Sequence, residues 1–171
     1  MLAFENAVYY TTKGFRRGGI TVEGGRVFLS PSEPVKEADV SGKIILPGLA
    51  DVHVHLREPG FFYKESIATG SESGARAGYT ALLAMPNLNP VPDSAAHLAP
   101  ELDAIARTAV VGVHPYAALT VGEKGRELSA IEELAPCVAG FSDDGKGVQS
   151  AELMRAVSYT HLRAHETSLH L

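Results

Sequence analysis

From residue 44 onward the chain alternates between apolar runs and segments with helical spacing, and no other feature restricts the possible folds as much. The apolar runs lie at 44–50, 80–85, 109–116 and 137–142, and the helical segments at 64–77, 95–108, 128–134 and from 151. A strand, a helix and a further strand in succession imply a right-handed crossover between parallel strands. We therefore predict an α/β fold with a parallel sheet or barrel.

Polar residues follow the carboxyl ends of these predicted strands. They are His53, His55, Arg57, Asn87, His114, Tyr116, Asp143 and Asp144. In a (β/α)8 barrel and in an open doubly wound sheet, ligands bind at this edge. The first strand-to-helix turn has no glycine-rich phosphate loop, which disfavours a nucleotide-binding sheet. Four strand–helix units are about half of a (β/α)8 barrel, which usually has about 250 residues.

Residues 1–43 have a different character, with short predicted strands separated by turns. The Gly24-Gly25 pair between the apolar segments 19–23 and 26–29 predicts a β-hairpin. A few short strands bury little surface by themselves, so this segment should pack against a further part of the structure. None of its residues suggests catalysis.

The overall composition excludes several classes of function. The chain has 171 residues, 45% of them hydrophobic, and a net charge of -5 without a basic stripe. Nucleic acid and anionic membranes are therefore not expected partners. We find no apolar run of 18 residues and no signal-peptide pattern. The single cysteine, Cys137, fits a reducing cytoplasm, and we expect it to be a small core residue.

The first strand carries two histidines near its carboxyl end. His53 and His55 are two residues apart, so in a strand they lie on one face, about 7 Å apart, and can reach one metal ion. Arg57 continues the same face, where its guanidinium suits a substrate carboxylate. The other face would pack through Val52, Val54 and Leu56. The alternative, two incidental histidines on a core strand, is less consistent with this spacing.

The later polar residues are open to more than one interpretation. Asp144 is the best candidate for a third metal ligand, although Asp143-Asp144-Gly145 could also be a simple turn. Asn87 is either a substrate contact or a loop cap. We expect His114 to be a core histidine with a satisfied hydrogen bond, and His97 to face solvent at the start of a helix.

Residues 51–60, Asp-Val-His-Val-His-Leu-Arg-Glu-Pro-Gly, resemble the signature of bacterial dihydroorotases of the amidohydrolase superfamily. Further stretches agree with the same family. They are Gly78-Tyr79-Thr80, Ala84-Met85-Pro86-Asn87, Pro90-Val91-Pro92-Asp93, Pro115-Tyr116-Ala117 and Phe141-Ser142-Asp143-Asp144-Gly145. The resemblance covers about residues 1–156.

The resemblance implies a (β/α)8 barrel flanked by a small β-sandwich, of which residues 1–43 supply the N-terminal part and residues 44–156 the first four strand–helix units. It implies zinc, two ions in the full-length protein, with His53, His55 and Asp144 as ligands, and substrate contacts from His55, Arg57 and Asn87. The implied reaction is the reversible cyclisation of N-carbamoyl-L-aspartate to dihydroorotate in pyrimidine synthesis, by a homodimer or in association with aspartate transcarbamoylase. The family's general acid/base Asp and two further histidines would lie later in the chain, so no catalytic acid/base is assigned here.

Two alternatives to a dihydroorotase stay open. Hydantoinases and allantoinases are related cyclic amidohydrolases that often bridge their metals with a carboxylated lysine, whereas the fourth strand here ends at Asp144. Non-catalytic dihydroorotase-like subunits, which scaffold a transcarbamoylase, tend to lose the metal histidines that this chain keeps.

The family pattern ends near residue 156, and residues 157–171 resemble one reading frame of a sequencing-library adapter. We expect this segment to be a non-native tail, in which His161 and His165 are not a metal site. For the chain as given we expect weak or absent activity and at best partial metal binding.

Overall fold

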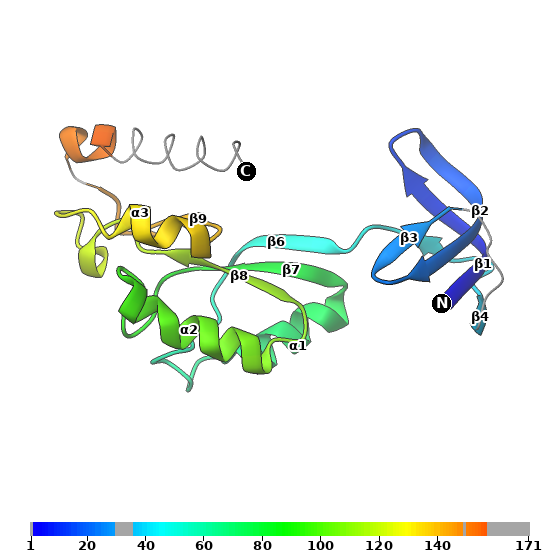
Figure 1. The fold of residues 1–171 in the computed structure, drawn as a ribbon, viewed down its shortest axis with the longest axis horizontal. Coiled ribbons are helices and arrows are strands. Elements are labelled where there is room, and N and C mark those ends of the chain that lie inside the picture. Colours follow the sequence, from blue (N-terminus) through cyan, green and yellow to red (C-terminus); the bar gives the residue numbers. More distant parts are fainter. Residues whose placement is uncertain (1, 30–35, 149, 157–171) are drawn as a thin grey trace. The chain divides into compact units, whose positions relative to one another are not determined.

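The computed structural model of the protein describes residues 2–29, 36–148 and 150–156 (Figure 1). The chain divides into two compact units, Met1–Pro47 and Gly48–Leu171. The segment 157–171, expected to be a non-native tail, lies outside the described residues.

The N-terminal unit is a five-stranded sheet. Its strands are β1 (Leu2–Thr11), β2 (Gly14–Glu23), β3 (Arg26–Phe28), β4 (Lys36–Asp39) and β5 (Ile44–Ile45). Their order is β3-β2-β1-β4, and β5 also pairs with β1. The predicted hairpin joins β2 to β3 through Gly24 and Gly25, whose φ angles of 54° and 75° are favourable for glycine. Ala7 and Ile20 are among its buried side chains.

The apolar run 44–50, predicted as one strand, is divided between the two units. Its first part, β5, pairs with β1 of the N-terminal sheet, whereas β6 (Leu49–Val54) begins the second sheet. Pro47 has no backbone N–H for pairing in a sheet, and Gly48 is a weak strand former. Strand pairing is therefore interrupted at these residues, between β5 and β6. Continuous hydrophobicity at this point therefore does not indicate a continuous strand.

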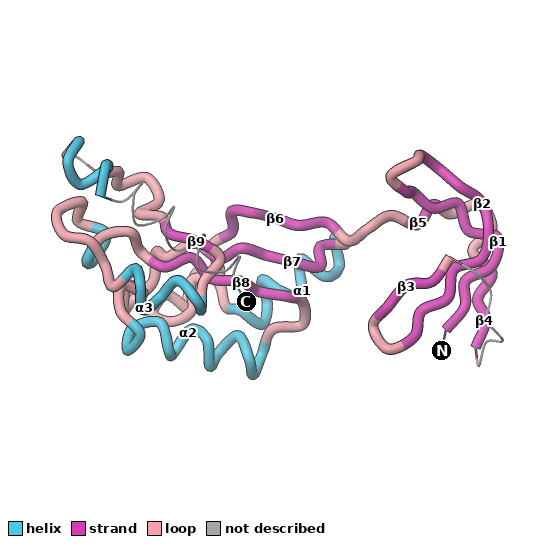
Figure 2. The backbone as a smooth tube through the Cα atoms, turned by 45° about the horizontal axis from the view of Figure 1, so that its top comes forward, coloured by secondary structure: helices cyan, strands magenta, loops and turns pink. Residues whose placement is uncertain are grey.

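The second unit contains a four-stranded parallel sheet. Its strands β6, β7 (Tyr79–Ala84), β8 (Gly112–Ala117) and β9 (Gly140–Phe141) are neighbours in chain order (Figure 2). Helix α1 (Ile67–Ala77) follows β6 and α2 (Ala95–Thr108) follows β7; β8 is followed by the short helices η1 (Val121–Glu123), α3 (Ile131–Leu134) and η2 (Ala135–Cys137). This alternation confirms the predicted α/β class. Within the described ranges no helix is both long and apolar enough to cross a lipid bilayer.

Helix α1 begins three residues later than its sequence pattern predicts. The Ser66 hydroxyl accepts a hydrogen bond from the Thr69 backbone N–H, which satisfies a donor that helical bonding leaves free. At the other end Gly78 adopts a left-handed conformation, with φ 90°, and terminates the helix.

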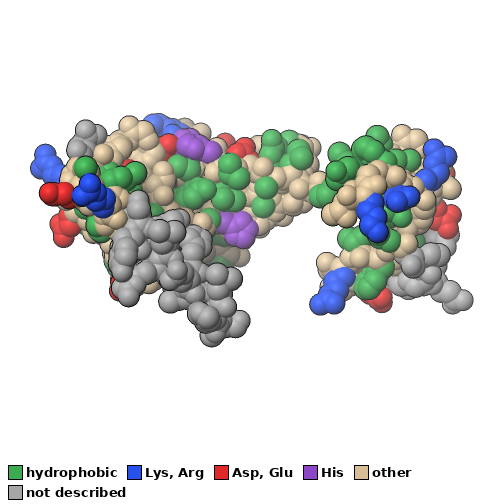
Figure 3. All heavy atoms as spheres, turned by 90° about the horizontal axis from the view of Figure 1, so that it is seen from above, with side chains coloured by type: hydrophobic (Ala, Val, Ile, Leu, Met, Phe, Trp, Pro, Cys, Tyr) green, Lys and Arg blue, Asp and Glu red, His purple; other side chains and the backbone are tan. Residues whose placement is uncertain are grey.

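Helices α1 and α2 cover the same face of the sheet (Figures 1 and 2). Ile67 of α1 and Ala104 of α2 pack with Leu82 of β7 and Val113 of β8 in one buried cluster. The opposite face is exposed, and hydrophobic and histidine side chains lie on the surface of this unit seen in Figure 3. The loops after the strands are therefore held on a sheet that is packed on one side.

The expectations that Cys137 and His114 lie in the core are both wrong. Cys137 is exposed, because residues 135–137 form the 3₁₀ helix η2 and the fourth strand begins only at Gly140. His114 is also exposed, because on β8 it alternates with the buried Val113 and lies on the face opposite the helices.

Candidate metal centre

A bulge at the carboxyl end of β6 sets the position of the first histidine. Asp51 pairs with Leu82 and Val54 with Ala84, so two residues of β6 lie opposite a single residue of β7 and the pairing is irregular between these positions. The Asp51 carboxylate accepts a hydrogen bond of 3.1 Å from the His53 backbone N–H. Asp51, which no sequence pattern marks as a site residue, thus supports the irregular backbone beside His53.

The bulge changes which β6 side chains pack. Sequence alternation places Val52, Val54 and Leu56 on one buried face, and Val54 and Leu56 do join the core cluster. Val52 is 63% exposed, so its predicted packing is wrong. Because a bulge shifts the alternation by one residue, Val52 does not share the face of Val54.

The structure brings His53, His55 and Asp144 together at the carboxyl ends of β6 and β9. Asp144 Oδ1 lies 3.3 Å from His53 Nε2, and Oδ2 lies 3.5 Å from His55 Nε2. One potential donor atom from each of the three residues lies within 4.8 Å of the other two. Two ligands that are each about 2.1 Å from a tetrahedral ion lie roughly 3.4 Å apart. The two spacings therefore fit a shared metal ion.

The protonation of His55 also favours metal binding. Burial lowers the pKa of His55, and the positive charge of Arg57 is the next largest cause. Asp144 raises this pKa, and His53 lowers it further. A lowered pKa favours the neutral imidazole, which is the form that coordinates a metal. The other ring nitrogen, Nδ1, is buried without a hydrogen-bond partner among the described residues.

The backbone at Asp144 is as unusual as that at the bulge. Asp144 has a φ of 29°, and its backbone N–H donates to the Ser142 hydroxyl at 3.0 Å. The preceding Asp143 has a different environment, since it is 5% exposed and accepts bonds from the backbone N–H groups of Leu119 and Thr120 at 2.8 and 2.9 Å. The Thr120 hydroxyl also donates to Asp143. Of the two adjacent carboxylates, Asp143 holds a loop and Asp144 faces the histidines.

Arg57 and Asn87 lie together beside this centre. Strand β6 ends at Val54, so Arg57 is placed by the following loop, with a φ of 60°, and not by strand alternation. Its Nη1 donates to the Asn87 backbone oxygen at 3.4 Å. The Asn87 side chain donates through Nδ2 to Glu123 Oε1 at 3.2 Å. No local sequence pattern indicates Glu123, whose partner lies 36 residues away in the chain.

The remaining predicted polar residues are not part of this group. His97 is half exposed and pairs with Asp93 of its own helix start at 2.6 Å. The Tyr116 hydroxyl donates to the Val52 backbone oxygen at 3.4 Å.

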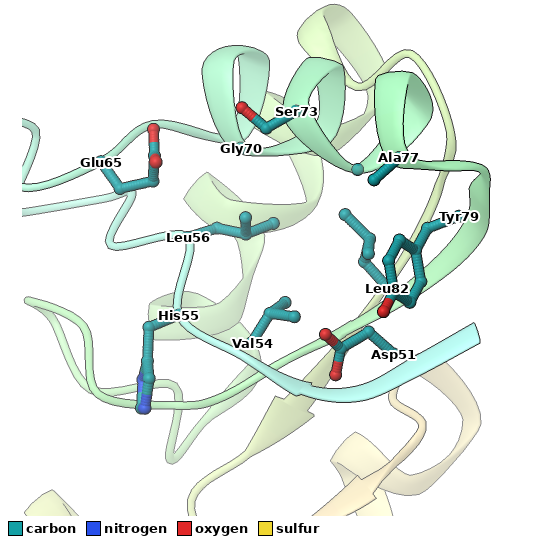
Figure 4. A pocket seen from close by; sticks show the side chains of 11 residues that line it. Asp51, Val54, His55, Leu56, Glu65, Gly70, Ser73, Ala77, Tyr79 and Leu82 are labelled. Atoms are coloured by element: carbon teal, nitrogen blue, oxygen red, sulfur yellow. The ribbon is translucent and has the colours of Figure 1, made fainter. Parts of the chain in front are cut away.

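A hollow of about 300 Å³ lies between α1 and the strands β6 and β7. Its walls include Asp51, Val54, Leu56 and Leu82, whereas the His55 ring points away from it (Figure 4). His55 is among its lining residues but His53 and Asp144 are not, so the hollow is not the candidate centre.

Comparison with protein families gives a match to the model described as "Dihydro-orotase-like" over residues 42–164. The chain belongs to this family. Among curated relatives, the dihydroorotase of Fusobacterium nucleatum is 49% identical over 116 residues, 68% of this chain and 27% of the relative. The dihydroorotase of Geobacillus thermodenitrificans is 47% identical over 145 residues, 81% of this chain and 34% of the relative. The chain thus spans between about a quarter and a third of the length of these relatives.

Solved structures also resemble this chain. The L-hydantoinase of Arthrobacter aurescens aligns with a TM-score of 0.77 at 19% identity, over 95% of this chain and 38% of that chain. A D-hydantoinase aligns with a TM-score of 0.68 at 16% identity, again over 95% of this chain and 38% of the other. At such identity the likeness concerns the fold. It confirms the first half of a (β/α)8 barrel, preceded by part of a small β domain.

Proposed function

We propose that this chain carries the first part of a dihydroorotase centre, with His53, His55 and Asp144 as ligands of a zinc ion. The observation that carries the proposal is the spacing of 3.3 and 3.5 Å between the Asp144 oxygens and the two histidine nitrogens. Family membership and the dihydroorotase relatives support the choice of reaction. The full-length centre would hold two ions.

The substrate is the cyclic amide dihydroorotate or its ring-opened form, N-carbamoyl-L-aspartate. A zinc ion supplies Lewis-acid chemistry at such a centre, polarising the ring amide carbonyl and lowering the pKa of water. Arg57 would bind the free carboxylate, since a guanidinium offers parallel N–H donors that match its two oxygens. Asn87 would donate to the same carboxylate, and His55 would contact the substrate from the metal side.

The hydantoinase alternative has less support. Its solved structures match this chain at only 16–21% identity, a level that concerns the fold. The residue at the end of the fourth strand is Asp144, and the neighbouring Lys146 forms an ion pair with Glu123 at 2.8 Å. That lysine is therefore engaged and does not face the two histidines.

Metal binding is tested by titrating zinc into the metal-free chain by calorimetry. We expect one bound ion, with the affinity falling on the order of tenfold or more in His53→Ala, His55→Ala and Asp144→Asn. His97→Ala is the matched control, since this histidine lies on α2 and is half exposed. Unchanged zinc affinity in all three ligand variants would contradict the proposed centre.

The reaction is tested in a chimaera in which residues 1–156 replace the aligned part of the Geobacillus thermodenitrificans relative. We expect zinc-dependent hydrolysis of dihydroorotate, with loss of activity in the His55→Ala version. Hydantoin is the comparison substrate. A folded, zinc-loaded chimaera that hydrolyses hydantoin and not dihydroorotate would favour the alternative.

A further inference from the structure

The Asn87 carboxamide is held by a buried acid from another loop. Its Nδ2 donates to Glu123 Oε1 at 3.2 Å, and Lys146 Nζ donates to the other oxygen, Oε2, at 2.8 Å. The Glu123 side chain is 1% exposed, whereas Lys146 is 56% exposed. A carboxylate only accepts hydrogen bonds, so the end of the Asn87 amide that faces Glu123 must be the NH2 group.

The loop that carries Glu123 is held in an unfavourable backbone conformation. Gly122 and Glu123 have φ angles of 61° and 54°, and for a residue other than glycine a positive φ is strained. The Gly122 backbone N–H donates to Asp93 Oδ2 at 2.8 Å, and the Gly125 N–H donates to the Thr120 hydroxyl at 2.8 Å. Contacts on both sides of Glu123 therefore maintain this conformation.

This arrangement also determines what Asn87 can offer to a ligand. Asn87 Oδ1 is buried and has no hydrogen-bond partner among the described residues, so the amide could in principle rotate by 180°. Rotation would place the NH2 group in the unpaired, buried position and the oxygen against the Glu123 carboxylate. Both changes are unfavourable, so Glu123 prevents the rotation. One Nδ2 proton of Asn87 binds Glu123, and the second Nδ2 proton is then the one that Asn87 can donate to a ligand.

We propose that Glu123 is a positioning residue, which orients the Asn87 carboxamide so that Asn87 and Arg57 both donate to one substrate carboxylate. The inference rests on the proposed function for the identity of the ligand, but the orientation of Asn87 is a property of the chain alone. Lys146 balances the charge of Glu123, so the buried acid does not repel the anionic substrate.

The test uses the zinc-loaded, ¹⁵N-labelled full chain and dihydroorotate as the probe. Glu123→Gln leaves one oxygen at this position, and the charged Lys146 binds that oxygen more strongly than the neutral Asn87 amide does. The introduced NH2 group then faces Asn87. Adding Lys146→Met removes the competitor, so the glutamine oxygen can again accept from Asn87. Glu127→Gln, an exposed acid of the same loop, is the charge-matched control.

We expect nuclear Overhauser contacts between the Asn87 NH2 protons and the Glu123 γ-protons in the unmodified chain. They should disappear in Glu123→Gln, with dihydroorotate affinity reduced on the order of tenfold, as for one charge-assisted hydrogen bond. The double variant should recover the Asn87 contacts. Its dihydroorotate affinity should lie within about twofold of that of Lys146→Met alone. If the Glu123–Lys146 ion pair had only a structural role, the double variant should lose further dihydroorotate affinity.

The outcomes separate this inference from the proposed function. Unchanged Asn87 contacts in Glu123→Gln, or no recovery in the double variant, would overturn the positioning role. If the contacts change as expected but no variant binds dihydroorotate, the orienting role of Glu123 stands and the substrate assignment fails.

Discussion

The neighbouring acids Asp143 and Asp144 offer a test of the structure, because the same Asp→Asn substitution should affect folding stability at one position and zinc binding at the other. Asp143 is buried and accepts three hydrogen bonds, from two backbone N–H groups and the Thr120 hydroxyl. Bonds to a charged acceptor contribute about 1.5–3 kcal/mol each and bonds to a neutral acceptor about 1 kcal/mol. In Asp143→Asn the two backbone N–H groups donate to a neutral oxygen, and the Thr120 hydroxyl loses its acceptor. We expect the unfolding free energy to fall by roughly 3 kcal/mol.

Asp144→Asn should leave the unfolding free energy of the metal-free chain within about 0.5 kcal/mol, because among the described residues its carboxylate pairs with the two histidines alone. Zinc at about 100 times its dissociation constant should stabilise the unmodified chain and Asp143→Asn by about 2.7 kcal/mol. Asp144→Asn should show little of this gain, since it lacks a ligand.

Urea unfolding followed by circular dichroism at the helical band measures both effects. The signal reports the second unit, because α1 and α2 lie there and the described elements of the N-terminal unit are strands. Asp103→Asn, an exposed acid paired with Arg107, is the control and should change stability by less than about 1 kcal/mol. Equal destabilisation by Asp143→Asn and Asp144→Asn would refute the division of roles.

Four further substitutions test the scaffold by the same unfolding measurement. Burial raises the pKa of Glu101 well above its ordinary value, so the folded chain holds a proton that the unfolded chain releases, and stability should fall by at most about 1.4 kcal/mol per pH unit as pH rises between the two pKa values. Glu101→Gln should remove this slope, and an unchanged slope would assign it to another group. Gly60→Ala should lower the unfolding free energy by about 2–4 kcal/mol, because a Cβ would lie 2.4 Å from the Asn89 backbone oxygen. Gly78→Ala, which has open space at a similar φ, should lower it by about 1–2 kcal/mol. Equal losses would contradict the steric reason. Ser66→Ala should cost about 1 kcal/mol through loss of the α1 cap, and no change would mean that the cap is dispensable.

The main outline of the fold could be predicted from sequence because it depends on local pattern. Buried strands and amphipathic helices each leave a periodic signal, so the α/β alternation and the limits of α2 were accessible. The pairing of strands is a tertiary property. The division of the run 44–50 between two sheets, and the bulge that exposes Val52, both depend on the register of a partner strand.

The candidate site likewise contains residues that a sequence motif indicates and residues that no local pattern indicates. His53 and His55 are visible as a motif, and the glycine after Asp144 marks a turn at the end of a strand. Glu123 has no local signal, since its role comes from contacts with a residue 36 positions earlier and another 23 positions later. The assignments of metal ligands and substrate contacts remain predictions until the variants are measured.

The contacts of Asp93, Glu123 and Asp143 run between the loops that follow three successive strands. A barrel is commonly regarded as a series of exchangeable strand–helix modules, each with its own loop. Here an exchange with a relative that lacks the partner residue would break a bond to the neighbouring loop. This half of the barrel should therefore be inherited and recombined as a single block, with crossover points tolerated only at its ends.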